Sequence, residues 1–347
     1  MRYDYNKLKS FGSQVMVKAG LEQAEADLFM DNLLYADSRG IGSHGISRLI
    51  NYSKRVRCGV ITAGANVQVL QESAASLVID GNNGIGAKIG RQAMDLCIAK
   101  AKESGCCTAT VRNANHFGVA SFYTAYAAKQ GMIAFVVSNS EAAVAPIGGA
   151  KAMLGTNPLG IAVPAQRNDP FDLDMATSVV ARGKVVLAQK EGKSIPLGWA
   201  VDKNGADTTD PNAVLDGGCM LPFGGPKGYA ISLFIDLMCS GLGGADNCRT
   251  TSHFWTDYDR PQNIGYFMYV IDPSKFLPDG SFTSRVDDML EEFKNCPTAP
   301  GVERVFIPGE IEAAKGRTSM ELGIELSDAV AEELRRVGAE YGVQPEF

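Results

Sequence analysis

Two of the three histidines lie in short polar segments rich in glycine, a setting typical of catalytic side chains. In the first segment, DSRGIGSHGISRLINY, the spacing of His44, Arg48 and Tyr52 predicts that they share one side of a helix. We expect residues 40–45 to form a turn and Ser43 to cap that helix. Because arginine binds carboxylates through its fork and histidine exchanges a proton near neutral pH, the stripe suits a substrate with a carboxylate and a carbonyl or hydroxyl group. A helix cap beside a surface arginine explains the same residues equally well.

The second segment, VRNANHFGVASFYTAYA, places His116 directly after a predicted strand and before a helix. Sites in α/β proteins form where the carboxyl ends of strands lie, so this position favours a functional role. A histidine that merely caps a turn is the alternative. The third histidine, His253, lies in the aromatic segment TTSHFWTDYDRP and is interpreted as structural. Together, His44 and His116 predict one site.

Three further segments combine polar residues with glycine or proline. LGTNPLG places Thr156 and Asn157 in a turn, and FDLDMAT ends a predicted strand at the carboxylate of Asp174. PFGGPKGYA joins a glycine loop and Lys227 to a helix N-terminus, which could hold an anion such as the phosphate of a dinucleotide. Each segment taken alone is also compatible with an ordinary turn.

The elements that must position these residues follow from hydrophobic periodicity. Residues 1–60, 85–104, 119–130 and 326–342 are predicted helices, and 227–242 is apolar almost all round, which predicts a buried helix. Predicted strands are VQVLQ, ASLVID, TATVR, MIAFVVS, LGIAVP, FDLDMA and GYFMYVID. This order predicts a mixed α/β fold. We expect an α/β domain over 71–310 and a helical module, carrying His44 and Arg48, built from 1–70 with 311–347.

Composition excludes several classes of protein. The chain has 347 residues, of which 45% are apolar. Its 33 basic and 39 acidic side chains give a net charge of −6, which disfavours binding to nucleic acids. No apolar run reaches the roughly 18–20 residues of a membrane span, and the N-terminus lacks a signal core. The eight cysteines form no CxxC pair, so we expect reduced thiols and no metal site. A cytoplasmic protein without nucleic-acid or membrane partners is expected.

The segment GNNGIGAKIG follows a predicted strand like a dinucleotide-binding motif, but its spacing is wrong. Gly90 follows Gly86 by four positions, where GxGxxG requires three. Asp80, just before the turn, would also repel a pyrophosphate. A turn and close helix packing explain these glycines better, and FGGPKGYA lacks the GxxxxGK[ST] pattern. Any nucleotide must be held by other means.

Seven segments, in order, resemble the type-2 malate/L-lactate dehydrogenase family: RGIGSHGISRL, NANHFG, APIGGAKAMLGTNPLGIAVPA, FDLDMAT, IPLGWAVDKNG, TTDP and PFGGPKGYAISLFIDL. The resemblance runs from about residue 4 to about residue 340. The family also includes ureidoglycolate, L-sulfolactate and diketogulonate enzymes and a cyclic-imine reductase. The resemblance implies an NAD- or NADP-dependent oxidoreductase of small 2-hydroxy or 2-oxo acids. It also implies a non-Rossmann fold with a mixed sheet, and a homodimer with its site near the subunit boundary.

The resemblance also implies roles for individual residues. His116 matches the proton donor or acceptor, and His44 lies on the substrate side; Asp174 either orients an imidazole or contacts the cofactor. Positions matching substrate contacts are Ser43, Arg48, Tyr52 and Thr156. Positions matching cofactor contacts are Ser140, Asp174, Met175, Ala176, Lys227, Pro308, Gly309 and Glu310.

We expect reversible hydride transfer, with Arg48 binding the carboxylate and His116 protonating the oxygen. Malate is the first candidate substrate; ureidoglycolate, L-lactate, sulfolactate and a cyclic imine are alternatives. A catalytically inactive relative that only binds a metabolite or cofactor is the alternative from another class. The segments CMLPFGGPKGYA and GGADNCRTTSHFWTDYDRPQN lie where family members differ, and neither Arg182 nor Arg249 decides between NAD and NADP.

Overall fold

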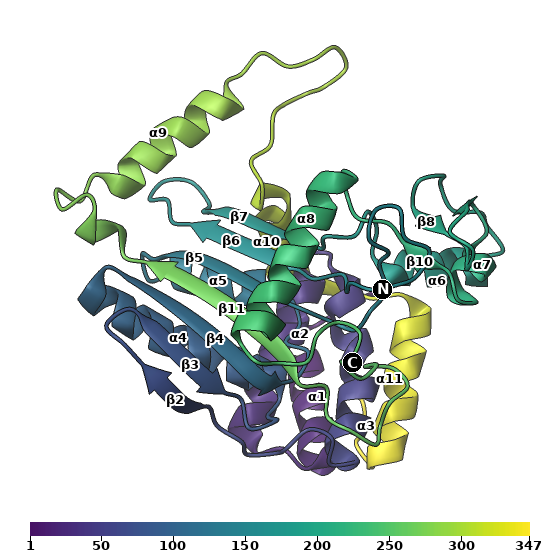
Figure 1. The fold of residues 1–347 in the computed structure, drawn as a ribbon. Coiled ribbons are helices and arrows are strands. Elements are labelled where there is room, and N and C mark those ends of the chain that lie inside the picture. The colour runs from purple at the N-terminus through teal and green to yellow at the C-terminus, as the bar shows by residue number, and fades with distance from the viewer.

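A seven-stranded sheet forms the centre of the computed structural model, which describes residues 1–347 (Figure 1). Its strand order is β2-β3-β4-β11-β5-β6-β7, and only β3 and β4 pair in parallel. The sheet is therefore mixed, and its order differs from that of a Rossmann fold. Both features agree with the sequence-based expectation. The strand bounds are β2 Gln68–Glu72, β3 Ser76–Asp80, β4 Cys106–Ala114, β5 Ile133–Ser138, β6 Leu159–Val163, β7 Phe171–Met175 and β11 Ile264–Ile271.

Two helices, α4 (Gly86–Ser104) and α5 (Ser121–Ala128), pack on one face of this sheet and share a buried core with it. The glycines of GNNGIGAKIG serve this packing, as expected. A Cβ at Gly86 would lie 2.2 Å from the carbonyl oxygen of His116, and one at Gly90 would lie 2.7 Å from the ring of Tyr123. Small residues are therefore needed where α4 meets the segment that carries His116.

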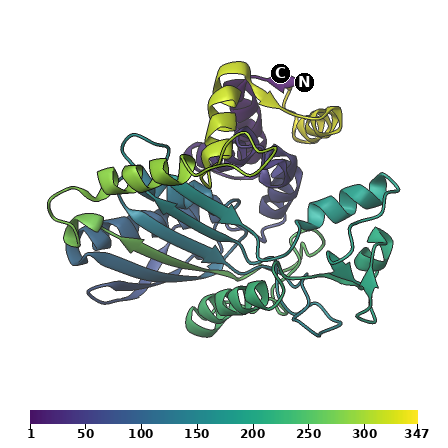
Figure 2. The ribbon, with the colours of Figure 1, turned by 90° about the horizontal axis from the view of Figure 1, so that it is seen from above.

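Helices from both ends of the chain form a second layer (Figure 2), and all of them except α10 contribute to one shared core. They are α1 (Tyr5–Ala19), α2 (Gln23–Ser38), α3 (Leu49–Arg57), α10 (Glu310–Leu322) and α11 (Asp328–Tyr341). The strands β1 (Arg2–Tyr3) and β12 (Ile324–Glu325) pair antiparallel and join the two termini. This contact between the ends matches the expected helical module, while its division from a second domain at residues 70 and 311 stays a prediction.

A small lobe follows β7 and lies at the right of Figure 1. Its strands pair antiparallel around a separate core. The elements are α6 (Arg182–Lys190), β8 (Ala200–Val201), β9 (Asp207–Thr208), α7 (Pro211–Leu215) and β10 (Cys219–Met220).

The helix predicted over 227–242 is present, but the prediction that it is buried is wrong. It consists of α8 (Pro226–Asp236), which continues as one π-helical stretch, η3 (Leu237–Leu242). Phe234, Leu237 and Leu242 are 46%, 52% and 62% exposed, whereas Ile235 and Cys239 pack on the sheet. The segment is apolar on both sides, but only one side is covered within the chain. No helix in the structure is long and apolar enough to span a membrane.

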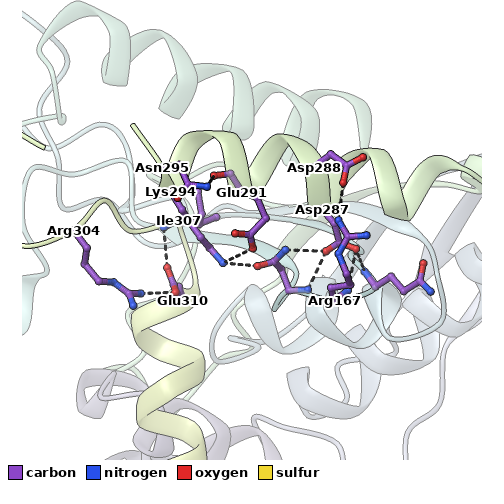
Figure 3. Close-up of polar contacts among 11 residues, drawn as sticks. Arg167, Asp287, Asp288, Glu291, Lys294, Asn295, Arg304, Ile307 and Glu310 are labelled. Atoms are coloured by element: carbon purple, nitrogen blue, oxygen red, sulfur yellow. Dashed lines mark hydrogen bonds and ion pairs between the residues drawn. The ribbon is translucent and has the colours of Figure 1, made fainter. Parts of the chain in front are cut away.

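Helix α9 (Phe282–Lys294) runs along the outside of the sheet and is held by buried polar contacts (Figure 3). The carboxylate of Asp287 accepts hydrogen bonds from the backbone N–H groups of Gln166, Arg167 and Asn168, at 2.9–3.0 Å. These residues lie in the turn between β6 and β7. Asp287 therefore ties α9 to the strand that carries Asp174.

Candidate active site

One cleft of about 640 Å³ brings together residues from the terminal helices, the sheet and the small lobe. The sequence-predicted residues that line it are Ser43, His44, Arg48, His116, Ser140, Thr156, Asp174, Met175, Ala176, Pro308 and Gly309. Three predicted residues do not line it. Tyr52 lies behind His116, Lys227 is exposed at the start of α8, and Glu310 lies in a neighbouring groove.

The expected helical stripe through His44, Arg48 and Tyr52 is interrupted. The chain forms two 3₁₀ turns, η1 (Gly42–His44) and η2 (Ile46–Arg48), before α3 begins at Leu49. The prediction that Ser43 caps the helix is wrong, because its hydroxyl instead lies 3.0 Å from Nδ1 of His44. The turns nevertheless direct His44 and Arg48 into the cleft, since Arg48 Nε donates to the Ser43 carbonyl at 2.6 Å.

The two imidazoles predicted to share a site do so. The rings of His44 and His116 are stacked with centroids 5.5 Å apart and planes inclined by 17°. Burial, together with the positive charge of Arg48, lowers the pKa of His44 from 6.5 to about 4. Burial also holds the pKa of His116 well below its ordinary value, with smaller contributions from His44 and Arg48. Both rings are therefore neutral at pH 7 in this structure.

The proton of neutral His116 is placed by its backbone surroundings. The N–H of Gly118 donates to Nδ1 at 3.3 Å, and the hydroxyl of Tyr52 lies 2.5 Å from the same nitrogen. Because Nδ1 accepts these hydrogen bonds, the ring proton lies on Nε2. His116 is thereby prepared as a hydrogen-bond donor through Nε2.

Asp174 does not orient either imidazole. Its Oδ2 accepts hydrogen bonds from the backbone N–H and the hydroxyl of Ser121, at 2.9 and 2.6 Å, and no hydrogen bond joins it to His44 or His116. The orienting position that was considered for Asp174 is filled by Tyr52. Asp174 instead anchors the start of α5 and lines the cleft beside Met175.

The loop that carries Thr156 is held by Ser140. The Ser140 hydroxyl accepts the backbone N–H of Thr156 at 3.1 Å, and Asn157 Oδ1 accepts the N–H of Ser140 at 3.2 Å. Asn157 in turn donates to the carbonyl of Ser232 on α8. These contacts join the ends of β5 and β6 into one rigid wall that presents the hydroxyls of Ser140 and Thr156 to the cleft.

The turn at residues 308–310 forms the opposite wall. The carbonyl of Pro308 accepts the N–H of Asp172 on β7 at 3.1 Å, and Gly309 packs so closely that a Cβ there would lie 2.7 Å from Asp172. The carboxylate of Glu310 pairs with Arg304 and accepts the backbone N–H of Ile307 (Figure 3). In this structure Glu310 therefore fixes the turn and faces away from the cleft.

Sequence reasoning missed several charged and aromatic residues of the cleft. Arg48 stacks on the ring of Trp255, 4.3 Å from its centroid, and Glu141 lines the cleft next to Ser140. Arg182, which the sequence analysis left undecided as a determinant of NAD or NADP use, also lines the cleft. At the far end lie Arg39, Asp172 and Glu312. Asp172 could have been found, because it lies two residues before Asp174 and alternation along a strand places both on one face. The other residues of the cleft named here are not marked by any local sequence pattern.

Two stacked neutral imidazoles and a guanidinium line one cleft on this non-Rossmann mixed sheet. Side chains of these kinds can exchange a proton and bind a carboxylate. The family model for malate/L-lactate dehydrogenase matches residues 3–335. The chain therefore belongs to the malate/L-lactate dehydrogenase family and is a dehydrogenase of the hydroxy acid type. This confirms the resemblance that the sequence motifs indicated.

Relatives and solved structures cover nearly the whole chain. L-sulfolactate dehydrogenase of Methanocaldococcus jannaschii is 39% identical over 96% of this chain and 95% of its own length. The structure of sulfolactate dehydrogenase from that organism matches with a TM-score of 0.92 and covers 100% of this chain and 99% of its own. Malate dehydrogenase of Pyrococcus horikoshii is 36% identical over 99% of this chain and 96% of its own length.

The names of two other relatives specify cofactors. An Escherichia coli relative, 34% identical over 91% of this chain and 89% of its own length, is a ureidoglycolate dehydrogenase (NAD(+)). A Chromohalobacter salexigens relative, 35% identical over 91% of this chain and 92% of its own length, is a (2R)-3-sulfolactate dehydrogenase (NADP(+)). Both names agree with the expectation of NAD or NADP, and together they show that the family accepts different acids.

Proposed function

We propose that this protein interconverts a 2-hydroxy acid and its 2-oxo acid with a nicotinamide cofactor. The observation that carries the proposal is the convergence of His44, His116 and Arg48 in one cleft. Arg48 binds the carboxylate of the acid, because its guanidinium is already fixed by Ser43 and Trp255. The Nε2–H group of His116 then donates a hydrogen bond to the substrate oxygen that changes between carbonyl and alcohol.

The cleft residues fit a nicotinamide dinucleotide by their chemistry. The hydroxyls of Ser140 and Thr156 and the carboxylates of Asp172 and Glu312 suit ribose and amide groups, and the guanidinium of Arg39 suits a phosphate. When bound, the cofactor supplies or accepts the hydride. The protein binds the acid through Arg48, holds the proton at His116 Nε2, and excludes water with Phe254 and Trp255.

His116 changes its proton affinity when the acid binds. Burial and the nearby arginines keep the ring neutral in the structure. A bound carboxylate and the negative charge that develops on the reacting oxygen favour the imidazolium form. Tyr52 stays hydrogen-bonded to the ring and keeps its plane fixed during this change. Oxidation of the hydroxy acid uses the other neutral tautomer, in which the ring proton lies on Nδ1 and is donated to Tyr52 Oη, so that Nε2 can accept the proton of the alcohol.

Malate is the first candidate substrate, and a ureido acid is the second. Arg182 offers a second cation in the cleft for the second carboxylate of malate. Glu141 favours the second candidate, because a carboxylate would accept hydrogen bonds from a ureido group and oppose another acid. Burial raises the pKa of Glu141, and Arg182 and His253 counteract that rise.

The far end of the cleft favours NAD over NADP. Asp172 and Glu312 both line it, and neither forms an ion pair within the described chain. Carboxylates accept hydrogen bonds from ribose hydroxyls and repel the 2′-phosphate of NADP. Arg39 is the cation there, and its guanidinium is stacked on the ring of Tyr35, 3.5 Å from the centroid. Because burial raises the pKa of Asp172 to about 7, Arg39 is offset by Glu312 and by a partly ionised Asp172, and the net charge of this end at neutral pH is slightly negative.

A homodimer is part of the proposal. The exposed apolar side of α8 and η3 is the kind of surface that a second subunit covers. Light scattering of the purified protein should give twice the chain mass of 37.0 kDa. A monomer at micromolar concentration would contradict this assignment.

The cytoplasmic location also stays a prediction.

The experiment that tests the function follows the absorbance of NADH or NADPH with a panel of oxo acids. The panel contains oxaloacetate, pyruvate, sulfopyruvate, the oxo form of ureidoglycolate and a cyclic imine acid. We expect oxidation of NADH with at least one 2-oxo acid. Turnover of the imine alone would assign the reductase alternative, and binding of cofactor without any turnover would favour a metabolite-binding protein.

A further inference from the structure

Asp37 is a half-buried carboxylate next to the candidate site, and none of the roles described above involves it. It is the penultimate residue of α2 and does not line the main cleft. Its Oδ2 accepts the backbone N–H of Ile46 at 2.6 Å. This N–H belongs to the first residue of the turn η2, which ends at Arg48. Asp37 therefore holds the two 3₁₀ turns together from another helix.

Gly45 provides the space that this contact needs. A Cβ at residue 45 would lie 1.9 Å from Oδ1 and 2.3 Å from Oδ2 of Asp37, and the three nearest atoms all belong to that carboxyl group. The backbone of Gly45, with φ −89° and ψ −158°, is one that other residues adopt without strain. Glycine is thus required here for the position of Asp37, not for an unusual backbone.

The contact lies between the two site residues that the turns carry. His44 precedes Gly45, and Arg48 N–H donates to the Gly45 carbonyl at 3.0 Å. Ile46 is fully buried in the helical core, which fixes one side of the turn. The carboxylate of Asp37 fixes the other side through the Ile46 N–H. A shift of this peptide would therefore move the guanidinium of Arg48.

We propose that Asp37 is a positioning residue that sets the place of Arg48, and through it the affinity for the acid substrate. The part that concerns the substrate rests on the proposed function. Burial raises the pKa of Asp37 to about 7, while the Ile46 hydrogen bond and Arg48 lower it. A neutral side chain that still accepts the Ile46 hydrogen bond is therefore a fair replacement, and Asp37→Asn is the conservative variant.

The first test compares Asp37→Ala with Asp37→Asn in steady-state kinetics. Asp37→Ala should raise KM for the oxo acid on the order of ten-fold, with a smaller change in kcat, because Arg48 binds the carboxylate equally in the ground and transition states. Asp37→Asn should keep KM within about three-fold, since its amide oxygen accepts the same hydrogen bond. The Kd of NADH should stay unchanged in both. Unchanged KM in Asp37→Ala, or equal loss of acid and NADH binding, would overturn the proposal.

Gly45→Ala provides an independent variant if Asp37→Ala folds poorly. It should raise KM in the natural background, because the new Cβ displaces the carboxylate. In the Asp37→Ala background it should add little, since the group it collides with is absent. Effects that multiply fully in the double variant would show that Gly45 acts without Asp37, and the proposal would fail.

A fluorescence measurement separates this inference from the proposed function. The chain has two tryptophans, Trp199 and Trp255, and Arg48 stacks on Trp255. In a Trp199→Phe background, Asp37→Ala and Gly45→Ala should change the emission of Trp255, and Asp37→Asn should not. Identical emission in all variants would overturn the positioning role whether or not any acid is turned over. Absence of turnover in the unmodified protein would overturn only the proposed function.

Discussion

The hydroxyl of Tyr52 lies 2.5 Å from Nδ1 of His116, although 64 residues separate the two along the chain. The N–H of Gly118 donates to the same nitrogen, which fixes the ring proton on Nε2. The reactive face of His116 is thus determined by a residue on α3 and by its own loop. This pair explains how a neutral, buried imidazole is held ready for proton transfer.

Replacing His116 tests the assigned proton role. His116→Ala should lower kcat by about 10²–10⁴-fold, which is the usual effect of removing a well-placed general acid or base. NADH should bind as before. Tyr52→Phe is the matched control, because it removes only the hydroxyl, and it should lower kcat less than His116→Ala does. Near-normal turnover in His116→Ala would transfer the role to His44.

The pH dependence follows from the lowered pKa of His116. Its free-enzyme pKa lies well below 6.5, so the neutral base is already present at pH 7. For oxidation of the hydroxy acid, kcat/KM should therefore stay level as the pH falls from about 8 and should decline only below the ordinary histidine range. For reduction, kcat/KM should rise about ten-fold for each unit by which the pH falls over the same range, because the fraction of His116 that is protonated rises by the same factor.

Those profiles need NADH binding measured over the same pH range as a control. Asp37 and Asp172 each have a pKa raised to about 7 by burial, so a change confined to cofactor binding would point to Asp172 rather than His116. An acid limb of oxidation centred at the ordinary histidine value would contradict the neutral, buried state of the ring.

Arg48 should control the affinity for the acid. Arg48→Lys keeps the charge but loses the fork, the Nε bond to Ser43 and the stacking on Trp255. It should raise KM for the oxo acid by about 10- to 100-fold, and Arg48→Ala should raise it further. kcat should fall less than kcat/KM. A larger loss of NADH affinity than of acid affinity would place Arg48 in the cofactor site.

Cofactor preference tests the charge of the far end of the cleft. We expect NADH to bind at least about ten-fold more tightly than NADPH, because Asp172 and Glu312 disfavour a 2′-phosphate. Glu312→Gln should reduce the ratio of NADPH Kd to NADH Kd, and Glu312→Lys should reduce it more. Both dissociation constants are measured by quenching of protein fluorescence. Glu310→Gln is the control, since that carboxylate faces Arg304 outside the cleft. Equal affinities in the unmodified protein would contradict the assignment.

Asp287 should stabilise the attachment of α9 to the sheet. In Asp287→Asn the new amide N–H₂ would face backbone donors, so the free energy of unfolding at pH 7 should fall by roughly 1–3 kcal/mol. The hydrogen bonds lower the pKa of Asp287 from 3.8 to about 2. The carboxylate therefore contributes its stability above pH 3.8 and loses it as the pH falls toward 2, where the variant and the natural protein should converge.

Asp288→Asn is the matched control for that measurement. Asp288 pairs with Arg167 at 2.6 Å, but their side chains are 73% and 55% exposed. An exposed pair contributes at most about 1 kcal/mol, so the melting temperature should hardly change at equal protein concentration. Equal destabilisation by both variants would mean that burial of Asp287 does not matter.

The strands of the sheet, the terminal helices and the two histidine segments could all be predicted from local sequence patterns. Period-two and period-3.6 patterns are local, so they are visible without knowing which elements meet. The same locality made it possible to reject the dinucleotide motif, because the spacing after Gly86 is wrong for phosphate binding and right for packing against Tyr123.

Which side chains share the cleft, and in which protonation state, depends on the packing of the whole chain. The break between η1 and α3 depends on Asp37 reaching Ile46 from α2, and the exposure of Phe234 depends on what covers α8. The tautomer of His116 depends on Tyr52. These are contacts between elements distant in sequence, and burial among them sets the pKa of each ring. No short pattern of residues encodes such contacts, because packing of the whole chain determines them.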